Sequence, residues 1–228
     1  MDRLIAVEPQ NQSQLDDYTT RGGVTLGPWT SHIYRSDPRH LGFLLARYKF
    51  CAKMLSGKNR VLEVGCGDAL GTPVVLQTVG SVHGLDFEAA VLRDAQERMP
   101  TEFAGRFSFS VTDISEQPMP EQFDAAYSLD VIEHVPAAQE DRFMANICAS
   151  LAREAVYIMG TPNITAEQYA SPGSREGHIN LKSGETLNKL VRKFFHNVFL
   201  FSMNDEVIHT GYTPMSHYLI AMGVGVKG

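Results

Sequence analysis

Apolar residues between positions 60 and 159 fall into two alternating patterns. Short runs rich in β-branched and aromatic residues predict strands at 60–64, 82–85, 107–111, 123–127 and 155–159. Apolar residues at helical spacing lie between these runs and predict helices at 72–79, 88–99 and 138–151. Strands that alternate with helices indicate right-handed crossovers, so this part of the chain predicts a parallel sheet with helices on both faces.

The N-terminal end of the chain departs from this alternation. Residues 1–20 are polar and predict an arm. A helix is expected further on, with Asp37 as its candidate N-cap and Gly57 as its stop. The expected organisation is an N-terminal arm or cap segment over residues 1–36 and a single domain over residues 37–228.

The C-terminal end has its own pattern. Residues 160–182 are rich in Gly, Pro, Ser and Asn and predict a long loop. Ser183 is a candidate cap for a helix that runs to about residue 195. Strands are expected at 198–201 and 217–221, and no helix lies between them. These two strands therefore predict an antiparallel pair at the edge of the sheet.

Composition narrows the class of protein. The chain has 228 residues, of which 43% are hydrophobic and 20% are charged, and this is typical of one globular domain with a full core. The net charge is −6 and no cluster of Lys and Arg stands out, so we expect no nucleic-acid partner. No apolar run approaches membrane-spanning length, and early charges argue against a signal peptide, so no membrane partner is expected.

The number and spacing of the cysteines indicate the cellular compartment. Cys51, Cys66 and Cys148 are widely spaced, odd in number and include no Cys-x-x-Cys pair. This pattern argues against a disulfide framework or a zinc knuckle. It predicts reduced thiols in a cytoplasmic protein.

The strongest chemical signal is a glycine-rich turn after the first predicted strand. Gly65, Cys66 and Gly67 let the backbone turn sharply and approach a ligand closely. A dinucleotide fingerprint would place its third glycine where this chain has Leu70. Glu63 would repel a pyrophosphate, but it suits a ligand that carries an ammonium group. The turn therefore predicts a site for a cationic ligand.

Two more acidic residues follow the next strands. Asp86 stands at the tip of the second strand, where a carboxylate can accept hydrogen bonds from ribose hydroxyls. Asp113 follows the third strand and could accept a hydrogen bond from an adenine amino group, with Ile114 packed on the ring. Each aspartate alone is equally typical of a helix cap or a turn.

A fourth motif, Asp130-Val131-Ile132-Glu133-His134, follows the fourth strand. With Glu63–Gly67, Gly84–Asp86 and Thr112-Asp113 it makes a set in which each motif stands at a strand tip. On this set the chain resembles the class I S-adenosylmethionine-dependent methyltransferases, in particular the branch of the ubiquinone-biosynthesis O-methyltransferases. By motif the resemblance covers roughly residues 57–160.

The resemblance implies an α/β fold. This is a Rossmann-like seven-stranded, mostly parallel sheet with helices on both faces, an antiparallel last strand and an N-terminal helical cap. It implies S-adenosylmethionine as cofactor and methyl transfer to an O or N atom. The residues it implies at the cofactor are Glu63, Gly65, Cys66 and Gly67 around the methionine portion, Asp86 at the ribose, Phe87, Asp113 and Ile114 at the adenine, and Asp130 near the methyl group.

Two histidines are the candidate catalytic bases. His134 ends the fourth motif, and His178 lies in the long loop after the fifth strand. Histidine titrates near neutrality, so either could take a proton from an acceptor hydroxyl. The structural alternatives are that His134 braces a helix end and that His178 packs within its loop. In ubiquinone-type relatives the residues matching Asp130, Glu133 and His134 can bind a divalent ion, but the same Glu-His pair occurs in relatives that need none, so no metal is expected.

The methyl acceptor is expected to be a small polar molecule such as a sugar or another metabolite. Three polar patches could contact it: Trp29, His32, Tyr34 and Arg35; then Tyr169, Ser171, Arg175 and His178; and last Asn204–Glu206 with His209 and Tyr212. Solvated loops are the alternative explanation.

Two other functions compete with methyl transfer. An NAD(P)-dependent oxidoreductase would share the sheet, but Leu70 and the lack of a Tyr-x-x-x-Lys pair count against it. A non-catalytic S-adenosylmethionine-binding partner subunit would show a degraded pocket, whereas the motifs here are intact. A homodimer is left open.

Overall fold

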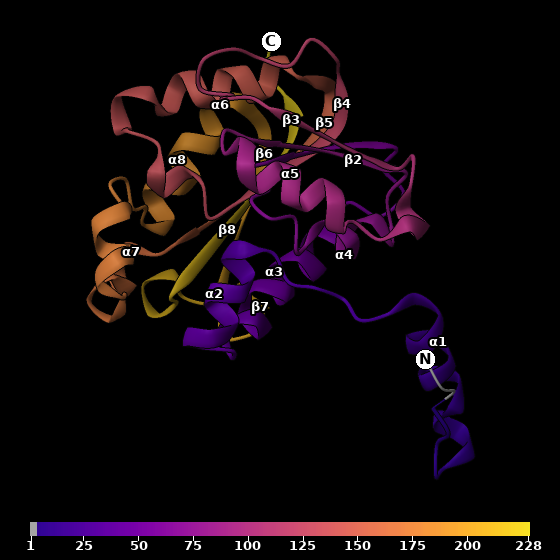
Figure 1. Ribbon diagram of the computed structural model, residues 1–228. Helices are drawn as coiled ribbons and strands as arrows, with labels where there is room; N and C mark the ends of the chain where they lie inside the picture. Colours follow the sequence, from indigo (N-terminus) through magenta and orange to yellow (C-terminus); the bar gives the residue numbers. More distant parts are fainter. Residues whose placement is uncertain (1–3) are drawn as a thin grey trace.

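The computed structural model describes residues 4–228, which form one eight-stranded sheet flanked by helices (Figure 1). Its strands are β1 (Arg60–Val64), β2 (Ser81–Asp86), β3 (Phe107–Val111), β4 (Phe123–Leu129), β5 (Leu151–Pro162), β6 (Phe195–Asn204), β7 (Val207–His209) and β8 (Tyr218–Val226). They lie side by side in the order β3-β2-β1-β4-β5-β8-β6-β7. The first five in this order run parallel, as the alternation of strands and helices predicts.

The C-terminal part of the sheet corrects the expected strand number. Strand β8 lies between β5 and β6 and is antiparallel to both, so the antiparallel last strand is confirmed. The expected count of seven was wrong because the polar connection between the last two predicted strands contains β7. This three-residue strand pairs with the end of β6 in a short hairpin. Its length is too small for a period-2 pattern to be visible in the sequence.

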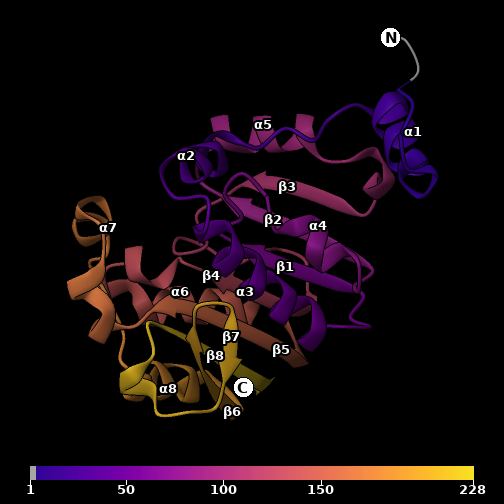
Figure 2. The same cartoon turned by 90° about the horizontal axis from the view of Figure 1, so that it is seen from below.

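Helices cover both faces of the sheet (Figure 2). They are α1 (Gln12–Arg21), α2 (Pro28–Ser36), α3 (His40–Met54), α4 (Thr72–Leu76), α5 (Ala89–Arg98), α6 (Glu140–Ala149), α7 (Pro172–Gly177) and α8 (Gly184–Phe194). Helices α6 and α8 pack on one face through Phe143, Met144, Leu187 and Val191. Helices α3, α4 and α5 cover the other face. The expected cap of α8 is confirmed, because Ser183 and Thr186 form a capping box.

Two local predictions were wrong. Asp37 does not cap α3; it ends α2, and α3 begins at His40. Residues 160–182 are not an irregular loop, since β5 extends to Pro162 and is followed by a 3₁₀ helix (Ile164–Tyr169) and by α7. Short helices with Gly, Pro and Ser at their ends have the same composition as a loop, so composition alone did not separate the two.

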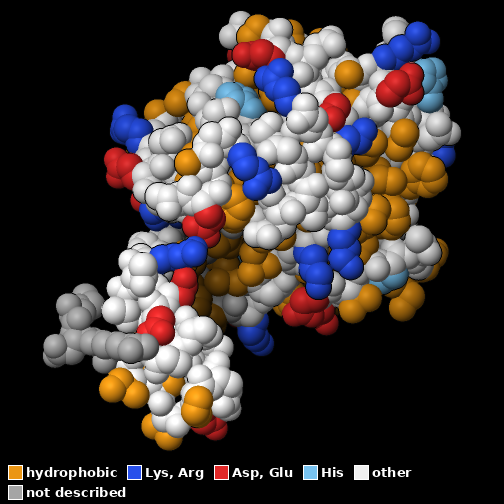
Figure 3. Space-filling view, turned by 90° about the vertical axis from the view of Figure 1, so that its right-hand side faces the viewer, with side chains coloured by type: hydrophobic (Ala, Val, Ile, Leu, Met, Phe, Trp, Pro, Cys, Tyr) orange, Lys and Arg blue, Asp and Glu red, His pale blue; other side chains and the backbone are white. Residues whose placement is uncertain are grey.

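The N-terminal segment stands away from the body (Figures 1 and 3). Helix α1 has no buried residue, and an ion pair from Arg21 to Glu102 (3.6 Å) links it to the domain. The expected polar arm thus contains a helix, and its residues 1–3 lie outside the described residues. The division of the chain at residue 36 stays a prediction. Over residues 4–228, no helix combines the length and the apolar character needed to cross a membrane.

Candidate functional site

The glycine-rich turn lies where the order of strands reverses, between β1 and β4. Gly65 and Gly67 both have left-handed backbone torsions, with φ of 71° and 54°. A Cβ on Gly65 would collide with Val131, and one on Gly67 would lie 2.7 Å from the ring of Trp29. Cys66 contributes through its backbone, because its thiol is buried and its amide donates to the carbonyl of Leu85 (2.9 Å). Ligands of open α/β sheets bind at such a switch point.

Glu63 lies at the end of β1 and is 1% exposed. Its Oε2 accepts a hydrogen bond from the Thr72 hydroxyl (2.6 Å), while Oε1 has no hydrogen-bond partner among the described residues. Burial raises the pKa of this carboxyl to about 7, against the lowering effect of Thr72. A buried carboxylate with a free oxygen can receive an ammonium group, as the turn predicts.

Asp86 ends β2 and ties the turn to this strand. Its Oδ2 accepts from the amide of Gly67 (2.9 Å), and its Oδ1 accepts from the amide of Glu88 (2.9 Å). A carboxylate has about four lone-pair sites, so both oxygens can still accept hydrogen bonds from ribose hydroxyls. Phe87 is 70% exposed at the edge of the same pocket, where its ring is available to a base.

Asp113 and Ile114 complete a pocket of about 170 Å³. Its walls also include Gly65, Asp86 and His134. The Asp113 Oδ1 accepts from the amide of Ser115 (2.8 Å), which fixes the carboxylate at the tip of β3. The structure therefore brings the residues expected at the methionine, ribose and adenine portions to one edge of the sheet.

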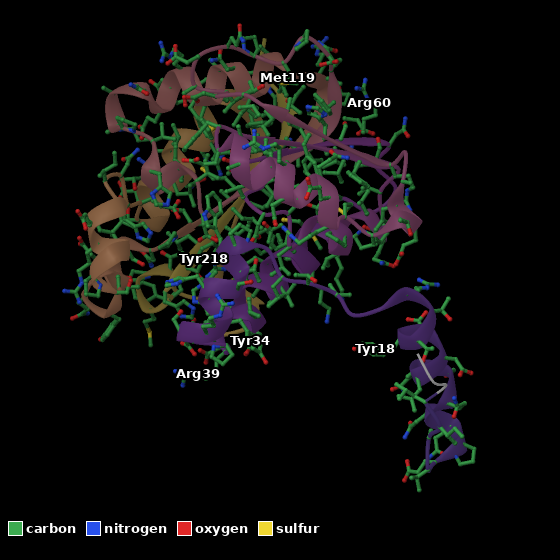
Figure 4. All side chains as sticks on the ribbon, viewed as in Figure 1. Tyr18, Tyr34, Arg39, Arg60, Met119 and Tyr218 are labelled. Atoms are coloured by element: carbon green, nitrogen blue, oxygen red, sulfur yellow. The ribbon has the colours of Figure 1, made fainter. Side chains whose placement is uncertain are left out.

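Asp130 is held in a left-handed conformation, with φ of 58°, at the tip of β4. Its Oδ2 accepts from Nη1 of Arg47 (2.6 Å), and the Arg47 guanidinium lies 3.7 Å from the centre of the Tyr218 ring. Arg47 comes from α3 and Tyr218 from β8, and Figure 4 shows Tyr218 beside α3. Arg47 Nε and the Tyr218 hydroxyl are buried and have no hydrogen-bond partner among the described residues.

The two candidate bases lie against each other. The rings of His134 and His178 are 5.2 Å apart, edge to face. Nδ1 of His134 is 2.9 Å from the carbonyl of Gly177, to which it donates in the tautomer that leaves Nε2 free. Burial and the neighbouring His134 lower the pKa of His178. His178 is therefore more readily neutral at physiological pH than an unperturbed histidine, as a proton acceptor must be.

Glu133 adds a carboxylate to this pair. Its Oε2 accepts from the Thr161 hydroxyl (3.0 Å), and Oε1 is buried without a hydrogen-bond partner among the described residues. Burial and the charge of Asp130 raise its pKa to about 8. Ligand atoms of Glu133, His134 and His178 lie within 4.8 Å of one another. One carboxylate and two imidazoles suit a divalent transition metal, so the residues fit an ion, with His178 in place of the Asp130 that the family pattern suggests.

The three polar patches have different environments. Trp29 lies on Gly67, whereas Tyr34 is exposed on the outside of α2 (Figure 4). In the second patch, Arg175 donates to the carbonyls of Ala170 and Gln168 and so serves its own loop. The third patch forms the β6–β7 turn and the segment that follows it.

Sequence reasoning missed Arg47, Tyr218 and Thr161. Arg47 carried a usable signal, because it lies on the same helical face as the apolar Leu44, Tyr48 and Cys51 and is buried. A charge on the buried face of a helix needs a partner, and this need points to a functional site. Tyr218 and Thr161 lie within apolar strands and show no such contrast.

A mostly parallel sheet with a glycine turn at its switch point and acids at successive strand tips is typical of Rossmann-like folds that bind nucleosides. The family model of a methyltransferase domain (Methyltransf_25) matches residues 61–154. The segment that carries the glycine-rich turn and the acids at the strand tips is therefore similar to methyltransferase domains.

Individual curated methyltransferases are similar to this chain as well. A probable S-adenosylmethionine-dependent methyltransferase of Mycolicibacterium smegmatis is 27% identical over 51% of this chain and 42% of its own length. The ubiquinone biosynthesis O-methyltransferase of Pectobacterium carotovorum is 25% identical over 78% of this chain and 68% of its own. The chain thus spans less than half of the mycobacterial relative.

The fold has solved counterparts. The N-methyltransferase NodS of Bradyrhizobium japonicum, in complex with S-adenosylhomocysteine, superposes with a TM-score of 0.64 at 16% identity. The match covers 88% of this chain and 93% of that one. At this identity the likeness concerns the fold.

Proposed function

We propose that this protein transfers a methyl group from S-adenosylmethionine to an O or N atom of a small polar acceptor, such as a sugar or another small metabolite. One observation carries the proposal: His134 both lines the cofactor pocket and contacts His178. A pair of side chains that can accept protons therefore borders the pocket that we propose for the cofactor.

Different residues would bind different portions of the cofactor. When bound, S-adenosylmethionine supplies an electrophilic methyl group on a sulfonium. Glu63 would hold the amine of the cofactor, Asp86 its ribose hydroxyls, and Asp113 with Ile114 its adenine. Their fixed positions would orient the cofactor so that its methyl group is already aligned with the acceptor atom when the acceptor binds.

The acceptor side would be served by the histidine pair. His178 would accept the proton of an acceptor hydroxyl, and His134 would orient the ring of His178 through their edge-to-face contact. An amine acceptor needs only to be unprotonated, so the same site would serve it without a base. Asp130, fixed by Arg47, would lie near the methyl end of the cofactor.

A second use of the same residues is supported by the cluster of Glu133, His134 and His178. These side chains would hold a divalent cation, which would lower the pKa of an acceptor hydroxyl. Methyl-transfer activity after chelation distinguishes this metal-bound site from the metal-free site that the sequence predicts. Activity that survives exhaustive chelation supports the base, and activity that returns only with added Mg²⁺, Mn²⁺ or Zn²⁺ supports the ion.

Methyl transfer to a library of sugars and small metabolites, read by mass, tests the function. We expect one or a few acceptors to gain a methyl group, and His178→Ala to lower kcat while S-adenosylhomocysteine affinity stays unchanged. Glu176→Gln, an exposed residue of the same segment, is the control and should leave kcat unchanged. A thermal-shift panel in which NAD(H) stabilises the protein and S-adenosylmethionine does not would contradict the proposal.

The remaining features of the proposed protein follow from the sequence. We propose a cytoplasmic protein that works without nucleic-acid or membrane partners, as a monomer or a homodimer, with residues 1–36 as a cap segment. On the face of the molecule in Figure 3, Lys and Arg are interspersed with Asp and Glu, so this face has no continuous basic patch.

A further inference from the structure

Asp68 attaches helix α2 to the glycine-rich turn. It directly follows Gly67 and is 5% exposed. Its Oδ2 accepts from the amide of Thr30 (2.7 Å), and its Oδ1 accepts from the Thr30 hydroxyl (2.7 Å). The preceding Gly27 offers no side-chain cap, so Asp68 supplies the cap of α2 from a distant part of the chain.

The contact between α2 and the turn is close on all sides. A Cβ on Gly27 would lie 2.5 Å from Cβ of Asp68 and would collide with Arg98, so only glycine fits there. Nη2 of Arg98 donates to the backbone carbonyl of Asp68 (2.8 Å), and its Nε pairs with Asp94 on the same helix (2.6 Å). The turn is therefore fixed to α5, while the Asp68 carboxylate holds α2.

Trp29 connects this attachment to the proposed cofactor site. It precedes Thr30 in α2, and its ring covers Gly67, where a Cβ would lie 2.7 Å away. The side chain is 45% exposed, so the ring lies between the turn and solvent. If the hydrogen bonds between Asp68 and Thr30 break, the N-terminal end of α2 loses its cap and Trp29 can leave the turn.

We propose that Asp68 and Thr30 form a latch that controls the rate at which the cofactor enters and leaves, with α2 and Trp29 as the lid. The inference rests on the proposed function, because it takes the Gly65–Gly67 turn as the cradle of the cofactor. All the contacts of the latch are between protein atoms. The latch therefore holds the lid closed to the same extent with and without bound cofactor.

This property gives the latch a kinetic signature. A weaker latch raises the association and dissociation rate constants by the same factor and leaves Kd nearly unchanged. A residue that only contacts the cofactor behaves differently, because its loss raises the dissociation rate constant and Kd together.

The single tryptophan makes the lid observable. Trp29 is the only tryptophan in the 228 residues, so the fluorescence of the full chain reports the lid. Stopped-flow mixing with S-adenosylhomocysteine gives both rate constants without any methyl transfer. Thr30→Val removes one hydrogen bond to a carboxylate and keeps the side-chain shape. We expect it to raise both rate constants about tenfold and to increase acrylamide quenching of Trp29 in the free protein.

Three further variants test the assignment. Ser31→Ala removes a hydroxyl of the same helix that bonds to the carbonyl of Leu26 (3.1 Å), so its rate constants should equal those of the wild type. Thr30→Ser keeps the hydroxyl and should also resemble the wild type. Asp68→Asn removes the negative charge and replaces one of the two acceptor oxygens with an amide group that donates, so it should raise both rate constants as Thr30→Val does. It covers the case that the valine variant does not fold.

Failure of the latch and failure of the proposed function give different results. Wild-type rate constants in the folded Thr30→Val or Asp68→Asn variant, or a higher Kd with an unchanged association rate constant, overturn the latch. A wild-type protein that binds no S-adenosylhomocysteine, by fluorescence and by calorimetry, overturns the proposed function itself.

Discussion

In the proposed function, Glu63 would link the stability of the free protein to its affinity for the cofactor. Its buried carboxyl has a pKa of about 7, raised by burial from an ordinary value of 4.5. That interval corresponds to about 3 kcal/mol in favour of the protonated carboxyl in the folded protein. Glu63→Gln replaces this carboxyl with a neutral group of the same shape, so the variant separates the effect of the charge from that of packing.

The sign of the effect follows from proton binding. Between pH 4.5 and about 7, the folded protein holds a proton on Glu63 that the unfolded chain has lost. The stabilisation from Glu63 is therefore complete below pH 4.5 and is lost as the pH rises through about 7, a decrease in the free energy of unfolding of up to about 3 kcal/mol. The glutamine variant lacks this decrease and should be more stable than the wild type at about pH 8.

Cofactor binding should show the opposite preference. An ammonium group beside Glu63 favours the ionised carboxylate, so wild-type affinity for S-adenosylhomocysteine should rise with pH and level off above about 7. Glu63→Gln should bind about 10- to 100-fold more weakly and lose this pH dependence.

Urea unfolding and titration calorimetry at about pH 5 and about pH 8 measure both effects. Glu154→Gln, an exposed glutamate on β5, is the matched control. Unchanged cofactor affinity in Glu63→Gln would refute the assigned role of Glu63. A wild-type stability difference between the two pH values that the variant retains in full would refute the electrostatic reasoning.

Three more substitutions have defined outcomes. Gly65→Ala puts a Cβ against Val131 at a left-handed position, so the melting temperature and the S-adenosylhomocysteine affinity by calorimetry should both fall; equal affinity would count against the cradle. Ser183→Ala removes the cap of α8 and should lower the free energy of unfolding by about 1 kcal/mol in urea without changing cofactor affinity. Asn180→Ala removes the side-chain donor to the carbonyl of Val135 (2.9 Å) close to His178, so steady-state kinetics should show a higher KM for the acceptor; a change confined to cofactor affinity would contradict this placement.

The sequence predicted the parallel half of the fold well for a physical reason. Strands such as 60–64 and 107–111 are short apolar runs between helices of regular period, and their bounds were predicted without error. The N-terminal start of α3 and the strand β7 were not predicted. Asp37 ends α2, and its carboxylate accepts a hydrogen bond from Nε of Arg39 (2.9 Å), so it is engaged before α3 begins. Strand β7 exists only by pairing with β6, which a three-residue stretch of sequence does not reveal.

The positions of the three acids at the strand tips were also predictable from the sequence. Glu63, Asp86 and Asp113 each follow a predicted strand, and the carboxyl ends of parallel strands meet at one edge of a sheet. The local pattern of strands was therefore enough to predict that these three carboxylates lie at the same edge of the sheet. The contact between His134 and His178 needed the structure, because the whole of α6 and β5 and then two short helices lie between them in the chain.

Three distant segments meet beside Asp130, which would lie near the methyl end of the cofactor in the proposed function. Arg47 from α3, Asp130 from the tip of β4 and Tyr218 from β8 form one buried polar group, and Arg47 Nε and the Tyr218 hydroxyl have no hydrogen-bond partner among residues 4–228. An unpaired buried polar atom costs free energy that a polar ligand or a bridging water can recover, whereas an apolar ligand cannot. These unpaired atoms therefore support the proposal of a polar acceptor, because a polar group that reached them would offer the hydrogen bond that an apolar group would not.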